Sequence, residues 1–209
     1  MKYNPMKHNR RSIRMKGYDY SKAGLYFITF RVQNGEMLFG AIENGQMILN
    51  NAGKMILAEW EKLPQRFNNI ELHEFVVMPN HFHGIVEIIT PVGAPLVGAQ
   101  ISGAHDDVNN DAAHAGDGPA ANVGAPTRGA PTEGPMRVTV GEMMGAFKSI
   151  TTLEYINGAN NLDWEPFAGK LWQRNFYEHI IRNEISYYKI FDYIINNPAR
   201  WKDDKFYLR

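Results

Sequence analysis

The sequence predicts an α+β fold, in which an antiparallel sheet of βαββαβ order carries its helices on one face. Short runs rich in aromatic and β-branched residues alternate in the manner of strands. Between them lie stretches whose apolar residues recur at helical spacing. With 44% hydrophobic and 12% aromatic residues in a chain of 209, we expect a single globular catalytic domain over residues 1–209, interrupted by one insert.

The first half of the chain contains three predicted strands, a hairpin and a helix. "LYFITFRV" (25–32) alternates as a strand does, and Asn44-Gly45 between two short apolar runs indicates a hairpin. "AGKMILAEWEKL" (52–63) has helical spacing, and Pro64 is expected to end that helix. Two further strands follow, "IELHEFVVM" and "HGIVEII", joined by a tight Pro-Asn connection.

The second half begins with a helix that the sequence marks at its first residue. Thr139 is followed three residues later by Glu142, which is the spacing of a capping box. The apolar residues expected to form the buried face of this helix are Met143, Phe147 and Ile150.

A strand and a helix complete the chain. "KLWQRNFYEHII" (170–181) is predicted to be a strand, and Asn183 can cap a helix that ends near Asn197, because Pro198 follows. With the hairpin of the N-terminal half set aside as an addition, the order is that of a ferredoxin-like βαββαβ sheet with a C-terminal helix.

Residues 91–135 form a low-complexity stretch of Gly, Ala, Pro, Asn and Asp. It has too little apolar surface to offset the entropy of ordering it, so we predict a flexible surface insert. It holds five acids and one base, which leaves a net charge of +4 on the rest of a formally neutral chain. His105 and His114, both in this stretch, are expected to be solvated rather than metal-bound.

The remaining composition limits the classes of function. The chain has no cysteine, which excludes a disulfide scaffold, a thiolate metal site and a cysteine nucleophile. The first 17 residues hold six bases and no acid, and no apolar run follows that could serve as a signal or membrane span. We expect a cytoplasmic protein with no membrane partner. A basic arm is compatible with phosphate contacts but does not require them.

A histidine pair is the first candidate for chemistry. In "VVMPNHFHGIVEI", His81 and His83 are two residues apart at the start of a strand, so both side chains lie on the same face of the sheet, and Phe82 lies on the other. Two imidazoles on one face can bind a divalent cation together. An unliganded pair is the alternative that this motif alone leaves open.

The last helix supplies a second candidate. At about 100° per residue, Tyr188, Phe191 and Ile195 fall on one stripe, with Tyr187 and Ile194 at its border, and we expect this stripe to be core. Tyr193 falls off that stripe, with Asn197 one turn further along the same side. A tyrosine there presents its hydroxyl, although a half-exposed tyrosine without a role is the alternative.

Together these residues resemble the single-tyrosine HUH transposases, the insertion-sequence-200-like enzymes, and especially their REP-associated tyrosine transposase branch. The resemblance covers nearly the whole chain outside the insert. It rests on motifs in the same order with similar gaps: "RRSIRMKGYDY", "VVMPNHFHGI", "FKSITT", "WQRNFYEHIIRN" and "DYIINNP".

The resemblance implies a metal-dependent endonuclease and strand transferase. Tyr193 would be the catalytic nucleophile and would form a 5′-phosphotyrosine link, while His81, His83 and Asn197 would hold Mg²⁺ or Mn²⁺. The expected partner is single-stranded or hairpin DNA, in DNA transposition. A bacterial, nucleoid-associated protein is implied, as either a monomer or a homodimer. His179 lies near the chemistry by resemblance and is interpreted as a supporting residue.

DNA contacts are predicted less firmly from the residues themselves. The basic candidates for the DNA backbone are Arg10, Arg11, Arg14, Lys148, Arg174 and Arg182. Trp172, Phe176 and Tyr177 could stack on bases, but the first two share a parity and are at least as compatible with the core. His73 is interpreted as a hydrogen-bonded strand residue.

Two other functions remain open at this stage. One is a replication or relaxase-type HUH nickase, against which the short chain argues. The other is a catalytically idle, domesticated hairpin-binding protein, against which the joint presence of His81, His83, Tyr193 and Asn197 argues.

Overall fold

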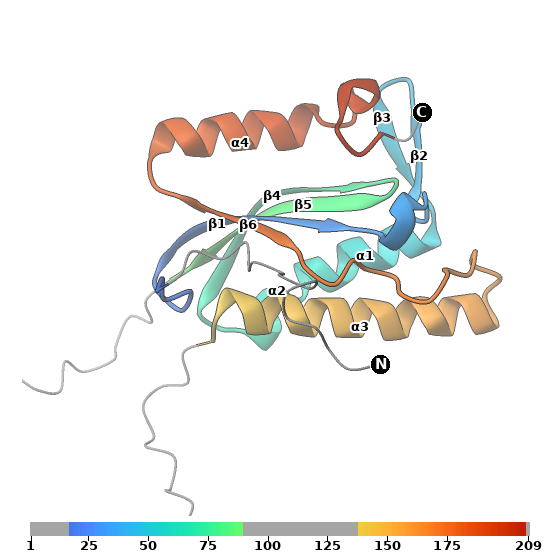
Figure 1. Cartoon of the computed structure of the whole chain (residues 1–209), viewed down its shortest axis with the longest axis horizontal. Helices are drawn as coiled ribbons and strands as arrows, with labels where there is room; N and C mark the ends of the chain where they lie inside the picture. The colour runs from blue at the N-terminus through green and yellow to red at the C-terminus, as the bar shows by residue number, and fades with distance from the viewer. Residues whose placement is uncertain (1–16, 90–137, 208–209) are drawn as a thin grey trace, which may run out of the picture. The chain divides into compact units, whose positions relative to one another are not determined.

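The computed structural model of the protein describes residues 17–89 and 138–207. They form the predicted α+β fold, in which a four-stranded sheet lies between helix α4 on one face and helices α1 and α3 on the other (Figure 1). The predicted insert, with His105 and His114, and the basic arm, with Arg10, Arg11 and Arg14, lie outside the described residues.

The strands are β1 (Gly24–Arg31), β2 (Gly40–Glu43), β3 (Gln46–Leu49), β4 (Ile70–Met78), β5 (His81–Ile88) and β6 (Tyr177–Ile181). The helices are α1 (Asn51–Glu61), α2 (Leu63–Arg66), α3 (Val140–Asn161) and α4 (Glu184–Asn196), with short 3₁₀ turns η1 (Gln33–Gly35) and η2 (Trp201–Asp203).

The sheet has the strand order β4-β5-β1-β6, and every neighbouring pair is antiparallel. Strands β1 and β4 are joined through α1, with β5 between them, and strands β5 and β6 are joined through α3, with β1 between them. This interleaving is that of the predicted ferredoxin-like βαββαβ sheet. The hairpin β2–β3 forms a separate two-stranded sheet.

Local sequence signals set several of the boundaries. Asn44 and Gly45 both have positive φ, 50° and 77°, as a two-residue type I′ hairpin turn requires. Helix α3 starts with the predicted capping box, in which both the Thr139 and the Glu142 side chains bond the opposite backbone N–H. The Asn183 side chain caps α4 by accepting from Ser186 N.

Two predicted boundaries are wrong. Of the predicted strand 170–181 only β6 forms a strand, and Trp172 makes an isolated antiparallel bridge with Val32. Between the two, the Lys148 ammonium binds the carbonyl oxygens of Gln173 and Arg174 at 2.6 and 2.9 Å. Helix α1 ends at Glu61, before the proline. Pro64 instead lies in the first turn of α2, where an N–H is not needed.

The main hydrophobic core lies between the sheet and helices α1 and α3. Its large, fully buried side chains come from β1, α1, β5 and α3 and include Phe30, Trp60, Phe82 and Phe147. Helix α1 approaches β5 at Gly84, where an added Cβ would lie 2.7 Å from the Trp60 ring. This glycine therefore allows α1 to pack closely against the strand that begins with the two histidines.

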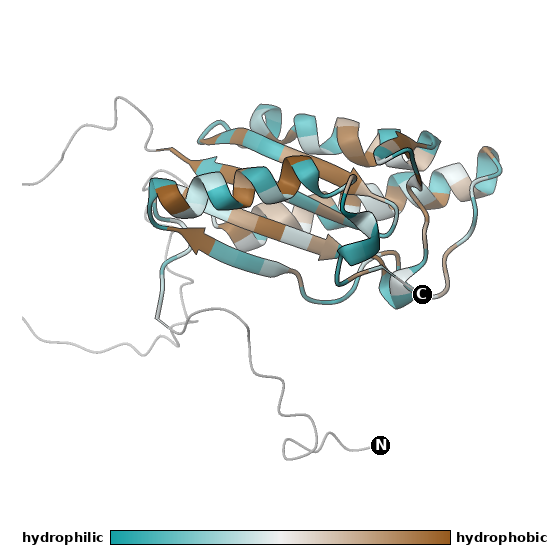
Figure 2. Cartoon of the chain, turned by 90° about the horizontal axis from the view of Figure 1, so that it is seen from above, coloured by the Kyte–Doolittle hydropathy of each residue, from teal (hydrophilic) through white to brown (hydrophobic). Residues whose placement is uncertain are grey.

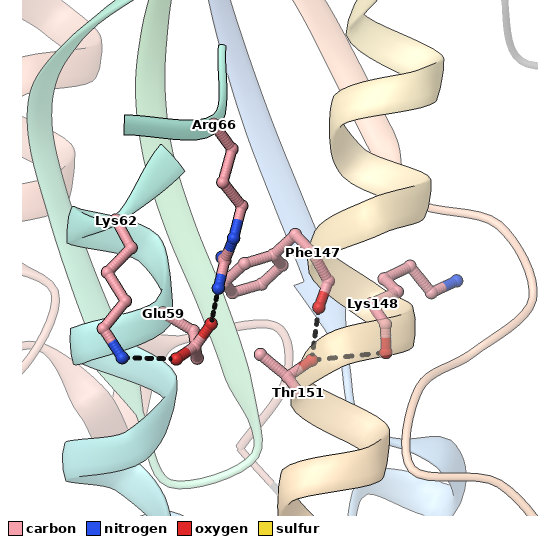
Figure 3. Close-up of polar contacts among 6 residues, drawn as sticks. All are labelled: Glu59, Lys62, Arg66, Phe147, Lys148 and Thr151. Carbon is pink, nitrogen blue, oxygen red and sulfur yellow. Dashed lines mark hydrogen bonds and ion pairs between the residues drawn. The ribbon is translucent and has the colours of Figure 1, made fainter. Parts of the chain in front are cut away.

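Two buried polar side chains on this same face of the sheet, Glu59 and Thr151, are satisfied locally, and Figure 3 shows both. The buried Glu59 carboxylate accepts from Lys62 Nζ at 2.8 Å and from Arg66 Nη2 at 2.7 Å. The Thr151 hydroxyl donates to the Phe147 carbonyl at 2.8 Å and accepts from Trp172 Nε1 at 2.9 Å. These bonds remove the cost of leaving the buried Glu59 and Thr151 side chains unpaired.

The predicted buried stripe of α4 is wrong. Tyr188 and Ile195 are 60% and 54% exposed, and Phe191 is only partly buried, whereas Ile194 is 1% exposed and packs against the sheet. Figure 2 shows hydrophobic and hydrophilic residues alternating along the outward surface of α4. Because apolar residues occur on more than one side of this helix, periodicity could not identify the side that faces the sheet. In α3, likewise, Met143 and Phe147 are buried as predicted, but Ile150 is only partly buried.

Candidate active site

Strand β5 presents two histidines on the sheet face that α4 covers. His81 and His83 point to this side, and Phe82 points into the main core on the other. Both imidazoles are fully buried, and their ring centroids are 4.6 Å apart. The predicted pairing of the two side chains on one face is therefore present.

The neighbours of His81 determine which ring nitrogen carries its proton. The Asn80 amide nitrogen donates to the carbonyls of Gly35 and Phe206, so its Oδ1 is the atom that lies 2.9 Å from His81 Nδ1. A carbonyl oxygen can only accept, so Nδ1 of the neutral ring is protonated. His81 Nε2 then bears a lone pair, and it is buried without a hydrogen-bond partner in the described residues.

His83 connects the sheet to α4. Its Nδ1 lies 2.8 Å from Thr29 Oγ1 on β1, and its Nε2 lies 3.0 Å from the Tyr193 hydroxyl. The ring is stacked on Phe27, with centroids 5.4 Å apart. The threonine hydroxyl can either donate or accept, but a Tyr193 hydroxyl that donates to Asp204 can only accept from His83, which places the proton of the neutral ring on Nε2 in the metal-free protein.

Helix α4 brings Tyr193 and Asn197 to the same point. Tyr193 is 37% exposed, and its hydroxyl donates to Asp204 Oδ2 at 3.2 Å. Asn197, one turn later, is 3% exposed and donates its amide to the same oxygen at 2.9 Å. Asn197 Oδ1 has no hydrogen-bond partner among the described residues. The structure thus brings together His81, His83, Tyr193 and Asn197, the four residues predicted for chemistry.

Asp204 also belongs to this cluster, although no sequence motif singled it out. Ligand atoms of His81, His83 and Asp204 all lie within 4.8 Å of one another, so this group could hold a metal ion. Asp204 Oδ1 accepts from the Phe206 backbone N–H at 2.6 Å. No periodic or motif signal separates Asp204 from its neighbour Asp203, since only the fold of the chain after α4 turns one of them inward.

The electrostatics keep both imidazoles neutral. Burial lowers the pKa of His81 to about 4. The charge of Asp204 opposes this shift, whereas nearby Lys205 and Arg31 act in the same direction as burial. Burial, together with His81 and Lys205, also holds the pKa of His83 well below its ordinary value. Neutral imidazoles are the form that binds metal ions. Burial, followed by the charge of Asp204, raises the pKa of the Tyr193 phenol, which therefore stays protonated in the metal-free protein.

Aromatic rings and cations surround the cluster. The Phe206 ring covers His81 at a centroid distance of 4.8 Å. The Arg31 guanidinium lies 5.1 Å from the Phe206 centroid, and Lys205 Nζ lies 4.7 Å from it. Lys205 Nζ is also 5.7 Å from the ring of Tyr177, which is 42% exposed. Arg31 and Lys205 were not among the predicted DNA contacts.

The basic residues predicted from sequence lie elsewhere. Lys148 and Arg174 line a cavity of about 510 Å³ beside α3, a helix on the sheet face opposite α4 (Figure 1). Lys148 is engaged there with backbone carbonyls, and burial lowers its pKa. Arg182 is exposed just before α4. The structure therefore does not bring Lys148 and Arg174 to the tyrosine.

The remaining candidates divide between core and surface. Trp172 is 4% exposed and Phe176 packs against the main core, in agreement with the core alternative, whereas Tyr177 is exposed beside the cluster. His179 pairs with Phe27 across the sheet and is exposed. His73 is hydrogen-bonded as predicted, with Glu87 at 3.0 Å and Tyr187 at 3.2 Å.

Comparisons with known proteins give relatives for almost the whole chain. No family model matches it. Among solved structures it is similar to a REP-associated tyrosine transposase bound to a REP hairpin, with 19% identity, a TM-score of 0.49 and coverage of 91% of this chain and 77% of the other. A structure from Deinococcus radiodurans is similar with 13% identity, a TM-score of 0.42 and coverage of 88% and 95%. The first of these is of the kind that the sequence motifs resemble.

Over residues 17–89 and 138–207, none of the helices has both the length and the apolar character needed to cross a membrane.

A relative matches this chain over nearly its whole length. An uncharacterised protein of Haemophilus influenzae is 38% identical over 210 residues, which span 99% of this chain and 98% of that protein. The chain belongs to the same family as this Haemophilus protein.

Proposed function

We propose that the protein is a metal-dependent single-strand DNA nicking and joining enzyme, a transposase of the single-tyrosine HUH type, with Tyr193 as its nucleophile. The observation that carries the proposal is the convergence of a half-exposed tyrosine hydroxyl with two buried neutral imidazoles and a buried amide. The sequence resemblance supports the same assignment of roles.

The donor atoms fit a divalent cation. His81 Nε2 and Asn197 Oδ1 are buried lone-pair carriers without partners in the described part of the chain. Such groups are costly unless a donor or a cation satisfies them. Together with His83 Nε2 they would hold Mg²⁺ or Mn²⁺, since two imidazoles and an oxygen leave open positions on an octahedral ion. A cation held there would polarise the scissile phosphate and offset the charge that develops on it.

Tyr193 would carry out the covalent step. Its phenolic oxygen attacks the phosphorus, the bond from phosphorus to the 3′ oxygen breaks, and the leaving strand departs as a free 3′-hydroxyl that holds the proton lost by the phenol. The 5′-phosphate stays bound to Tyr193, and attack by another 3′-hydroxyl reverses the step and joins strands. The phosphoester energy is kept in the link, so no ATP is required.

The position of Tyr193 suits this role. The hydroxyl is directed to the cluster by His83 and Asp204, while more than a third of the residue remains accessible to a substrate. Its raised pKa means that the residues alone do not ionise it. Nucleophilic attack at neutral pH therefore requires the added positive charge of the filled site.

Single-stranded DNA fits the surroundings better than a duplex does. Lys205 and Arg31 supply positive charge beside the cluster, and Tyr177 offers an exposed ring on which a base can stack. We propose these residues as the DNA contacts nearest to the scissile phosphate. Arg182, Lys148 and Arg174 would contact more distant parts of a hairpin, and His179 would support the site from β6.

The test is covalent capture of DNA. Purified protein is incubated with 3′-labelled hairpin oligonucleotides, because the strand on the 3′ side of the nick is the one that stays on Tyr193, with Mn²⁺ or with chelator, and resolved under denaturing conditions. We expect a Mn²⁺-dependent protein–DNA adduct that Tyr193→Phe cannot form. Tyr188→Phe is the matched control, because Tyr188 lies on the same helix and is 60% exposed. Hairpin binding without any adduct would contradict the assignment as an enzyme and indicate a DNA-binding protein of the same fold.

A further inference from the structure

Asp204 is the one acidic residue of the histidine cluster, and nothing in the proposed chemistry uses it so far. We infer that Asp204 is the anionic ligand of the metal site and exchanges its hydrogen bonds with Tyr193 and Asn197 for a bond to the cation. This inference rests on the proposed function for the presence of a cation, and it adds a residue and a coupling that the proposed function does not contain.

The charges around Asp204 support a cation ligand. In the described residues its carboxylate accepts from three neutral donors, the Tyr193 hydroxyl, the Asn197 amide and the Phe206 backbone N–H. Two of its neighbours, His81 and Asn197, each carry a buried acceptor without a hydrogen-bond partner in the described residues, His81 Nε2 and Asn197 Oδ1. A partly buried anion next to unpaired lone pairs is an unfavourable arrangement until a positive charge enters it.

A purely structural role of Asp204 explains the position of only one of its two carboxylate oxygens. Oδ1 accepts from the Phe206 N–H two residues later, as turn-forming aspartates commonly do. Oδ2 is turned to the tyrosine and the asparagine, which serves no turn. Asp203, by contrast, is exposed and lines a different cavity, beside the β2–β3 hairpin.

A carboxylate also changes which ion the site prefers. Imidazoles alone suit zinc and other transition metals, whereas oxygen ligands suit Mg²⁺ and Mn²⁺. With Asp204 and Asn197 the site offers two oxygens beside two nitrogens.

The hydrogen bonds of Asp204 give its binding a consequence for the nucleophile. Oδ2 now holds the Tyr193 hydroxyl at 3.2 Å and the Asn197 amide at 2.9 Å. If Oδ2 held a cation, it would bind these two donors less well, so the Asn197 amide could turn its Oδ1 to the site and the Tyr193 phenol could meet a phosphate. Asp204 would thus couple filling of the site to release of Tyr193.

The test is Mn²⁺ affinity, measured by electron paramagnetic resonance and calorimetry on the full chain without DNA. We expect Asp204→Asn to weaken Mn²⁺ binding at least tenfold, and Asp203→Asn to leave it unchanged. Asp204→Glu, which restores a carboxylate, should recover part of the affinity. Thermal unfolding of each variant without metal shows whether the fold is kept, and the Glu variant carries the test if the Asn variant unfolds.

Two outcomes overturn the inference, and they are distinguishable. If Asp204→Asn binds Mn²⁺ as tightly as the unaltered protein while His83→Ala does not bind it, the metal site stands but Asp204 is not a ligand. If the unaltered protein binds no Mn²⁺, or His83→Ala binds it unchanged, the metal site of the proposed function fails as well.

Discussion

The two faces of the central sheet belong to the same strands but bury different kinds of side chain. Beneath α1 and α3 lies a continuous apolar core, in which Phe82 and Trp60 have ring centroids 4.5 Å apart. Beneath α4 the apolar cluster has only four buried members, Phe27, Ile85, Ile181 and Ile194. His81, His83, Asn197 and Tyr193 lie on the same face, together with Thr29 and with partly buried apolar residues such as Val76. One face therefore supplies stability, and the other concentrates desolvated polar groups that stability alone would not favour.

Adjacent residues of β5 should show this difference most strongly. Phe82→Ala should lower the free energy of unfolding by about 3–5 kcal/mol, because it removes a fully buried ring from the main core. His83→Ala should cost less than about 2 kcal/mol yet reduce DNA cleavage at least about 100-fold. Urea denaturation and the adduct assay measure the two effects. Equal losses of stability would mean that the α4 face is an ordinary core.

Neighbouring residues of α4 test which side of that helix is buried. Ile194→Ala should cost about 2–4 kcal/mol, since the residue is 1% exposed, and Ile195→Ala should change stability by less than about 0.5 kcal/mol, since it is 54% exposed. Thermal unfolding of the two variants under identical conditions is the measurement. A large loss from Ile195→Ala would show that its surface is covered, for example by a second copy of the chain.

The contact of α1 with β5 can be broken without touching the cluster. Gly84→Val should cost about 1–3 kcal/mol, because its side chain would collide with Trp60 on the helix side of the sheet. Adduct formation per folded molecule should remain near that of the unaltered protein. A variant that is stable but inactive would show that the two faces are coupled through the strand.

The ion pairs of Glu59 give the smallest effect, and it depends on pH. Burial opposes ionisation of Glu59, but Lys62 and Arg66 outweigh it and hold its pKa below the ordinary value of 4.5. Glu59→Gln should therefore cost about 1–2 kcal/mol at pH 7. A carboxyl with a lowered folded-state pKa stabilises the protein above its unfolded pKa, and this is lost as pH falls through the folded pKa. The difference between the two proteins should fade below about pH 4.5. A pH-independent difference would assign the effect to packing.

The two faces also differ in how far the sequence predicts them. The apolar runs of β1, β4 and β5 and the capping box at Thr139 are local patterns, and the predicted strands and helix start are confirmed. The histidine pair and the Tyr193–Asn197 spacing are local patterns too. Asp204, Asn80 and Thr29 reach the cluster only through the fold, and α4 carries apolar residues on more than one side. Periodicity therefore could not identify them.

Locating the protein–DNA bond tests whether Tyr193 is the nucleophile and forms a 5′-phosphotyrosine link. After adduct formation with Mn²⁺, nuclease and trypsin digestion should leave a 5′-phosphonucleotide on the peptide that spans residues 190–200, in which Tyr193 is the only tyrosine. Mass spectrometry of that peptide reports both the residue and the polarity of the link. The account predicts a 5′-phosphate on Tyr193. A link to the peptide that spans residues 183–189, which contains Tyr187 and Tyr188, or a 3′-phosphate at any position, would contradict it.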